Sequence, residues 1–172
     1  MTLLIGRTIG KVLFYFKEVQ NEKYSVRSRK HYFISDAHEK FYYEKLQEVR
    51  YQDVYHKALC YCLGINGDTR KNADRIYNFK TGSVKTKCLH EGWQTSGSLK
   101  VVRMAFNLYC NSTPSVWDYE DAEEQVNECR QYTVEDIFCC VYAPYFWQAI
   151  QIRYPEYIVY NQKLHAMLGG ID

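Results

Sequence analysis

Hydrophobic residues recur every three or four positions from residue 35 onward, which is the spacing of one face of an α-helix. After Asp53, for example, apolar side chains occupy positions i, i+3, i+4 and i+7 between Tyr55 and Cys62. Ser, Thr, Asp or Pro marks the start of most of these runs, as is typical of helix N-termini. We therefore predict an all-α fold, a single compact domain of seven or eight short helices that begin near Ser35, Asp53, Asp68, Ser83, Ser98, Thr133, Pro144 and Tyr157.

Two segments depart from this pattern. Residues 1–30 fit an amphipathic helix and fit a β-hairpin around Asn21-Glu22 equally well, so we expect an appended N-terminal arm before a helical domain over residues 31–172. Residues 111–132 have the most loop-like pattern of the chain, because a Pro-containing break is followed by an acidic run. Gly64 is expected to end the second helix, and the third is expected to run to Phe79.

The composition is that of one globular domain. The chain has 172 residues, of which 47% are hydrophobic, and it is long enough to bury a substantial core. Tyrosine is unusually frequent, with 17 copies. Such rings suit the rim of a helical core, an interface or a base-stacking surface, and we favour the core rim.

Charge is unevenly distributed although the net charge is only +2. Residues 1–110 contain 19 Lys/Arg and 10 Asp/Glu, a net charge of +9. Residues 111–172 contain 3 Lys/Arg and 10 Asp/Glu, a net charge of −7. The basic body can attract a polyanion, or it can pair with the acidic final third of the same chain, or both can simply be solvated; self-pairing or solvation is favoured over polyanion binding.

The cysteines indicate a reducing compartment. There are seven, an odd number, with no Cys-x-x-Cys spacing, so we expect reduced core thiols, no metal site and no cofactor. The charge-free stretch from Ile137 to Ile152 is broken by Pro144 and is too short to cross a bilayer. We therefore expect a cytoplasmic protein with no membrane span.

The start of the helix near Ser98 is the best candidate for an anion site. Backbone N–H groups and hydroxyls at such a start can face a phosphate or carboxylate, and two cations follow within about one turn. Basic residues a few positions upstream would widen the patch. An ordinary helix cap with surface cations is the simpler interpretation, and it is favoured. The candidate residues are Lys85, Lys87, Thr95, Ser96, Ser98, Lys100 and Arg103.

No established catalytic motif is present. The five histidines never occur at i, i+3 or i+4, and neither a Walker loop nor a nucleophile elbow occurs. Each histidine is expected to be a surface or packing residue. Enzymatic activity is left open, with non-enzymatic function favoured; an enzyme would be a ribonuclease-type hydrolase using a histidine or Glu135 as acid or base.

Three segments carry a resemblance. They are Ser35-Asp36-Ala37-His38-Glu39-Lys40-Phe41-Tyr42, then the run from Trp93-Gln94-Thr95-Ser96-Gly97-Ser98 to Ala105-Phe106-Asn107-Leu108, and the run from Tyr132-Thr133 to Glu156-Tyr157. Together they resemble an uncharacterised family of small proteins from Firmicutes, their phages and integrative elements, over residues 31–157. The resemblance transfers no chemistry. It implies, by analogy with other small proteins of mobile elements, an inhibitor of host defence such as an anti-CRISPR protein.

Three functions are therefore expected in order of preference. The first is a binding protein that blocks a Cas9–guide RNA complex, with its acidic third mimicking phosphate charge. The second is an RNA-binding or RNA-cleaving protein that uses the basic helix start. The third is a homo-oligomer, such as a dimer, joined through Tyr-rich faces. The candidate acidic partner-binding residues are Asp118, Glu120, Asp121, Glu123, Glu124 and Glu128.

Overall fold

The computed structural model describes residues 31–157. The predicted N-terminal arm over residues 1–30 and the body of the last predicted helix lie outside the described residues. Eight α-helices, two 3₁₀-helices (η) and one two-stranded ladder form between residues 36 and 153, which confirms the all-α prediction. In chain order they are α2 (Asp36–Glu48), α3 (Val54–Ile65), α4 (Gly67–Lys71), α5 (Ala73–Ile76), β1 (Tyr77–Asn78), β2 (Ser83–Val84), η1 (Thr86–His90), α6 (Ser96–Cys110), η2 (Pro114–Asp118), α7 (Ala122–Arg130), α8 (Val134–Phe138) and α9 (Ala143–Arg153).

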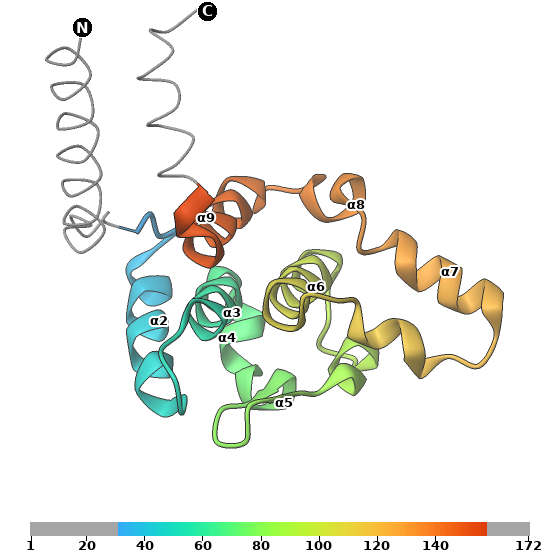
Figure 1. Ribbon diagram of the computed structural model, residues 1–172, viewed down its shortest axis with the longest axis horizontal. Helices are drawn as coiled ribbons and strands as arrows, with labels where there is room; N and C mark the ends of the chain where they lie inside the picture. Colours follow the sequence, from blue (N-terminus) through green and yellow to red (C-terminus); the bar gives the residue numbers. More distant parts are fainter. Residues whose placement is uncertain (1–30, 158–172) are drawn as a thin grey trace, which may run out of the picture. The chain divides into compact units, whose positions relative to one another are not determined.

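Helix α3 forms the centre of the core. It packs against α2, α6 and α9, which surround it in Figure 1. From Ala58 to Leu63 every side chain of α3 is fully buried, so this helix is covered on all sides rather than on one face. The predicted N-caps Ser35 and Asp53 both accept a hydrogen bond from the backbone N–H three residues later, which fixes the starts of α2 and α3.

Gly64 does not end α3 as predicted but lies inside it. A β-carbon at this position would lie 2.4 Å from the Cδ2 atom of His38, and would also crowd Phe41. The glycine therefore allows the ring of His38 on α2 to approach the backbone of α3. A glycine after a hydrophobic run is typical of the end of a helix, and the sequence therefore predicts one here. Close packing of a glycine against a neighbouring helix has no local sequence signal that would have indicated otherwise.

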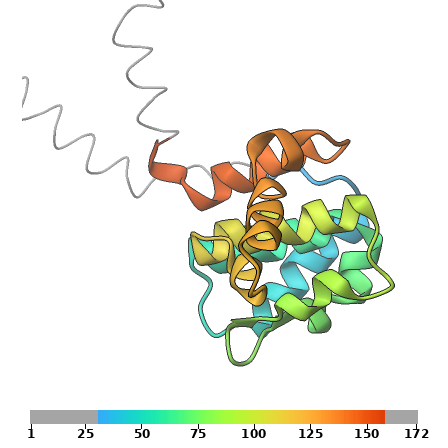
Figure 2. The same ribbon diagram turned by 90° about the vertical axis from the view of Figure 1, so that its right-hand side faces the viewer.

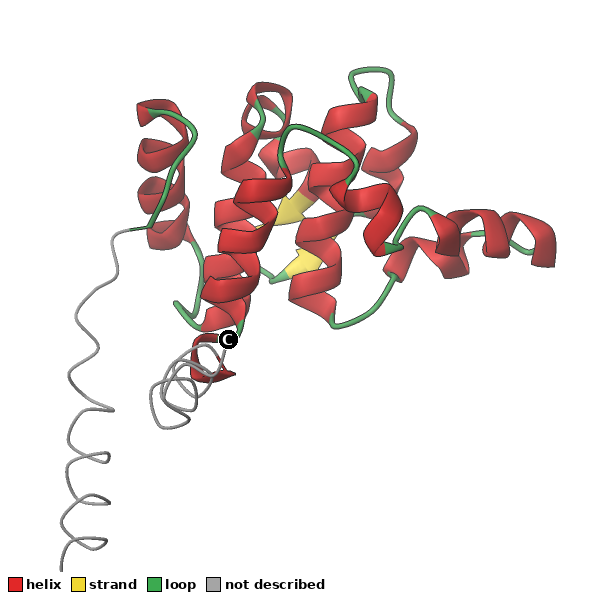
Figure 3. Ribbon diagram, turned by 90° about the horizontal axis from the view of Figure 1, so that it is seen from above, coloured by secondary structure: helices red, strands yellow, loops and turns green. Residues whose placement is uncertain are grey.

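The third predicted helix is shorter than expected. It divides into α4 and α5 at Asn72, and Tyr77 and Asn78 then pair with Val84 and Ser83 in an antiparallel hairpin (yellow in Figure 3). Gly82 has a φ of +76°, a conformation that only glycine adopts without strain, so it closes the turn of this hairpin.

The segment predicted to be most loop-like forms two helices, η2 and α7. We call residues 114–130 the acidic lobe. The lobe lies at the right-hand edge of Figures 1 and 3, and α7 faces the viewer in Figure 2. Asp121 caps α7 by accepting hydrogen bonds from the backbone N–H groups of Glu123 and Glu124. The polar sequence of α7 buries only Glu128, which explains why no hydrophobic periodicity marked it.

Candidate functional site

The hydroxyl groups at the start of α6 are engaged in a helix cap. The Thr95 hydroxyl accepts from the Ser98 backbone N–H at 3.1 Å, and the Ser98 hydroxyl accepts from the Thr95 backbone N–H at 2.7 Å. Ser98 is fully buried and also donates to the Gln94 side chain at 2.6 Å. This reciprocal arrangement is a capping box. Ser96 is exposed, whereas the Ser98 hydroxyl is buried within the cap and does not face solvent.

The two cations of α6 pair with carboxylates of the acidic final third. The Lys100 ammonium donates to the backbone carbonyl of Asp136 and lies 3.6 Å from its carboxylate. Arg103 is buried, and its Nε and Nη2 atoms donate to the two carboxylate oxygens of Glu128 at 3.0 and 3.2 Å.

Arg103 and Glu128 therefore correct two predictions at once. One was assigned to a solvent-facing anion site and the other to a solvent-facing acidic surface, but each is the partner of the other. Only 5% of Arg103 and 3% of Glu128 are exposed, and such burial is tolerated because each charge is compensated and hydrogen-bonded. At this pair the basic body and the acidic final third are joined within one chain.

A buried polar cluster extends from this ion pair. The Ser115 hydroxyl donates to Glu128 at 2.7 Å and lies 3.1 Å from the Tyr132 hydroxyl. Burial raises the pKa of Tyr132 to about 12, although its hydrogen bond with Ser115 opposes the shift. The cluster joins η2, α7 and Tyr132, two residues beyond the end of α7, to helix α6, so it fixes the acidic lobe to the core.

Lys85 and Lys87 line a groove to which none of the other predicted anion-site residues contributes. The groove has a volume of about 490 Å³ and is formed by α5, β2 and η1. Lys85 donates to the Asp74 backbone carbonyl at 2.6 Å, and the neighbouring Arg75 pairs with Glu91 at 2.8 Å. The groove residues are Asp74, Arg75, Val84, Lys85, Thr86, Lys87, Cys88 and Glu91.

Five of the six predicted acidic residues remain exposed on the acidic lobe. Within residues 31–157 none of the five takes part in an ion pair, in contrast to Glu128. The only cation of the lobe itself is Arg130, at the end of α7. The lobe therefore presents a surplus of negative charge to solvent. The five residues are Asp118, Glu120, Asp121, Glu123 and Glu124.

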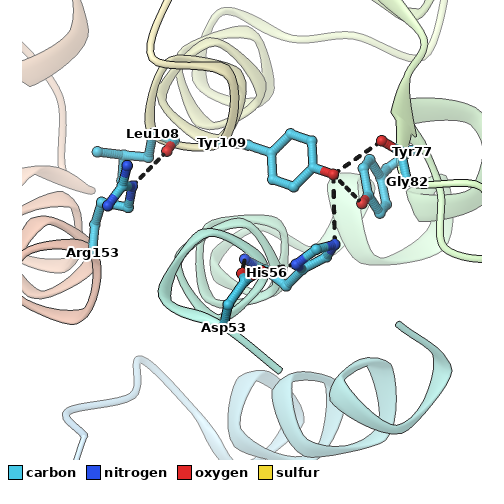
Figure 4. A network of polar contacts seen from close by, with 7 residues as sticks. All are labelled: Asp53, His56, Tyr77, Gly82, Leu108, Tyr109 and Arg153. Carbon is cyan, nitrogen blue, oxygen red and sulfur yellow. Dashed lines mark hydrogen bonds and ion pairs between the residues drawn. The ribbon is translucent and has the colours of Figure 1, made fainter. Parts of the chain in front are cut away.

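A second polar network, which we did not predict, joins α3, α6 and the hairpin (Figure 4). The Asp53 carboxylate lies 2.8 Å from Nδ1 of His56, and Nε2 of His56 lies 3.5 Å from the Tyr109 hydroxyl. That hydroxyl donates to the Gly82 carbonyl at 2.9 Å and accepts from Tyr77 at 2.8 Å. The three-residue spacing of Asp53 and His56 was the one local signal of this network, because an N-cap side chain contacts the third helical residue.

The network acts as a structural tie rather than as an exposed acid–base pair. Burial pushes the pKa of Asp53 upward, but hydrogen bonds from the backbone and ring of His56 outweigh it and lower the pKa. Burial raises the pKa of Tyr77, and its donation to Tyr109 adds to the shift. None of these side chains lines the groove described above. Asp53 and His56 have the chemistry of an acid–base pair. Nε2 of His56 faces the Tyr109 hydroxyl, however, and that hydroxyl is hydrogen-bonded to Gly82 of the hairpin.

Arg153 of α9 contacts the C-terminal end of α6. Its Nε atom donates to the Leu108 carbonyl at 3.0 Å, and its Nη2 atom donates to the side chain of Asn111 at 3.0 Å. The guanidinium group lies 3.4 Å from the centre of the Tyr55 ring. A buried cation at the C-terminus of α6 complements the partial negative charge of the last carbonyls of that helix.

The cysteines are all free, as predicted, but only some are core residues. Cys60, Cys62 and Cys88 are buried, and burial raises the pKa of Cys60 and of Cys88 to about 12. Cys139, expected in the core, is exposed, as is Cys129. Over residues 31–157, no group of three His, Cys, Asp or Glu side chains gathers in a geometry that suits a metal ion. In the same range, no helix has the length and apolar character needed to cross a membrane.

Comparison with known proteins identifies a family without assigning a function. A family model described as "Family of unknown function (DUF6075)" matches residues 28–166. No curated protein and no solved structure matches the chain. Because the matched region covers most of the sequence, including every helix described above, the chain belongs to the family of unknown function DUF6075.

Proposed function

We propose that this protein is a binding protein without catalytic activity, whose acidic lobe occupies a basic, nucleic-acid-binding surface of a partner protein. One observation carries the proposal: five carboxylates of the lobe face solvent without ion-pair partners in the described part of the chain, whereas Glu128 and Asp136 are paired with cations of α6. Unpaired surface carboxylates on one lobe create a local negative potential that attracts a cationic partner.

The lobe is well suited to this role because it is held in place. The cluster of Arg103, Glu128 and Ser115 fixes the buried side of the lobe to α6, and Asp121 fixes the first turn of α7. Carboxylates on an ordered scaffold lose less conformational freedom on binding than carboxylates on a flexible tail. An arrangement of this kind can take the place of nucleic-acid phosphates on a basic protein surface.

The partner that we propose is a host defence complex, with Cas9 bound to its guide RNA as the first candidate. The resemblance to small proteins of phages and integrative elements supports this choice, and the protein would then be an accessory protein of a mobile element acting in the cytoplasm of a bacterial host. The basic channel in which such nucleases hold nucleic acid has the charge that the acidic lobe requires.

The direct test is binding and inhibition with a neutralised lobe. The full chain should comigrate with the Cas9–guide RNA complex at micromolar concentration and low salt, and it should reduce DNA cleavage. A variant carrying Asp118→Asn, Glu120→Gln, Asp121→Asn, Glu123→Gln and Glu124→Gln should bind at least about tenfold more weakly. Asn at position 121 keeps the helix cap, so the change removes charge and not structure.

The matched control is Lys85→Ala with Lys87→Ala, which changes exposed charges outside the acidic lobe. This control should bind as the unchanged chain does. Binding of the unchanged chain should also weaken as salt rises, because exposed charges are screened. Absence of comigration at low salt, or equal binding by the neutralised variant, would contradict the proposal.

RNA binding is the second candidate function, and one observation favours it. Lys85, Lys87 and Arg75 line the same groove, although Asp74 and Glu91 partly offset their charge. RNA held there should dissociate with rising salt, and Lys85→Ala with Lys87→Ala should abolish the binding. Labelled RNA that stays intact and unbound at low salt would exclude both the binding and the cleaving version.

A further inference from the structure

Trp117 of η2 is the most exposed aromatic residue among residues 31–157. Its exposed fraction is 79%, whereas the preceding residues of the same 3₁₀-helix, Ser115 and Val116, are buried. The neighbouring positions therefore fill the space beneath η2, and the indole is directed outward. A tryptophan this exposed contributes little to folding, because the ring leaves water only when it meets another surface.

The surroundings of Trp117 indicate what that other surface is. The residue after it is Asp118, the first of the exposed carboxylates, and η2 packs against α7, which carries Glu123 and Glu124. Val126, on α7, is also 51% exposed. The acidic lobe thus combines apolar side chains with unpaired negative charges. Interfaces commonly have this composition, in which an aromatic anchor is bordered by charged groups that set orientation.

We infer that Trp117 anchors the partner-binding face of the acidic lobe, and that the partner is a folded protein with an apolar pocket bordered by Lys and Arg side chains. This inference rests on the proposed function, and it narrows the class of partner. Charge complementarity selects a basic surface, and the exposed indole selects a surface with a pocket. A flexible polycation offers the charge but no pocket, so it would use the carboxylates and leave Trp117 in water.

The contribution of the Trp117 indole to binding can be separated experimentally from that of the exposed carboxylates. Trp117→Ala removes the anchor without changing charge, and Trp147→Ala on α9 is a matched control because Trp147 is also exposed, at 58%. Each variant is titrated with the Cas9–guide RNA complex and, separately, with poly-lysine. Trp117→Ala should weaken binding to the complex by about 30-fold or more, the loss expected of an interface anchor, and should leave poly-lysine binding unchanged. Trp147→Ala should alter neither.

A fluorescence measurement provides a second readout. Emission of the unchanged chain should shift to the blue when the complex is added, and Trp117→Phe should abolish the shift while circular dichroism shows an intact helical fold. If Trp117→Ala binds the complex as tightly as Trp147→Ala does, the anchor role is excluded while the acidic lobe keeps its proposed function. If the unchanged chain does not bind the complex, the proposed function fails and this inference fails with it.

Discussion

At the scale of single residues, His38 shows how burial determines a protonation state. Nδ1 of its ring accepts a hydrogen bond from the Ile34 backbone N–H at 3.3 Å, and Nε2 donates to the Tyr61 carbonyl at 2.8 Å. One nitrogen acts as acceptor and the other as donor, which is the pattern of a neutral imidazole. Burial lowers the pKa of His38 to about 4, against the opposing effect of the Tyr61 hydrogen bond.

The stability of the fold should therefore depend on pH through His38. The folded pKa lies below the unfolded value of 6.5, so the unfolded chain binds the extra proton first as pH falls. The contribution of His38 is complete above pH 6.5 and is lost as pH falls toward 4, a loss on the order of 3 kcal/mol. Urea unfolding at a series of pH values measures it. His38→Gln, which keeps a donor but does not titrate, should flatten the profile in that interval; an unchanged slope would contradict this assignment.

Gly64→Ala should destabilise the protein through the same contact. The added β-carbon would lie 2.4 Å from the ring of His38, so either α2 or the ring must move. Overpacking of a buried site costs about 1–3 kcal/mol, and we expect a value near the upper end. Gly92→Ala is the control, because no atom lies within 4 Å of the β-carbon position there. Thermal unfolding compares the two variants, and equal melting temperatures would refute the close approach of His38.

At the scale of secondary-structure elements, the sequence predicted the helices whose caps are local. Ser35, Asp53 and Thr133 precede hydrophobic runs and cap α2, α3 and α8 as expected. The hairpin of Tyr77–Asn78 and Ser83–Val84 was not predicted, because two-residue strands are too short to show alternation. Helix α7 was not predicted because it packs through a buried glutamate instead of an apolar stripe.

The candidate site was less predictable than the fold. The acidic run and the basic positions of α6 could be found in the sequence, but their pairing could not. Arg103 and Glu128 are 25 residues apart in the sequence. Helical periodicity predicts which face of the helix carries Arg103, but it does not predict which other element covers that face. Lys100 meets Asp136 across a still longer separation. Pairing at this range is decided by how the helices pack.

Glu128→Gln should loosen the attachment of the acidic lobe. The change leaves the Arg103 guanidinium buried without a carboxylate, which costs about 3 kcal/mol when one partner of a buried pair is removed. Glu124→Gln, on the exposed side of α7, should change the free energy of unfolding by less than about 0.5 kcal/mol. Urea denaturation gives both values. Adding Arg103→Met to Glu128→Gln should recover part of the loss; no difference between the two glutamine variants would show that the pair does not stabilise the fold.

At the scale of the whole chain, the negative charge of the final third divides into a paired part and an unpaired part. Part of the negative charge of the final third is neutralised within the fold by ion pairs. Glu128 pairs with Arg103, and Asp136 pairs with Lys100. The rest remains on the surface of the acidic lobe, at positions that the same internal pairs hold in place. A net charge of only +2 conceals this division, because the cations and the unpaired carboxylates lie on different parts of the chain. We therefore propose that the unpaired carboxylates bind the partner, whereas the paired ones maintain the fold.

The most direct test of this division is amide hydrogen exchange of the full chain, free and bound to the Cas9–guide RNA complex. The account predicts that binding protects residues 114–130, the acidic lobe, and leaves the exchange of residues 85–103 unchanged. Protection confined to residues 85–103, with the lobe exchanging as it does in the free chain, would contradict it.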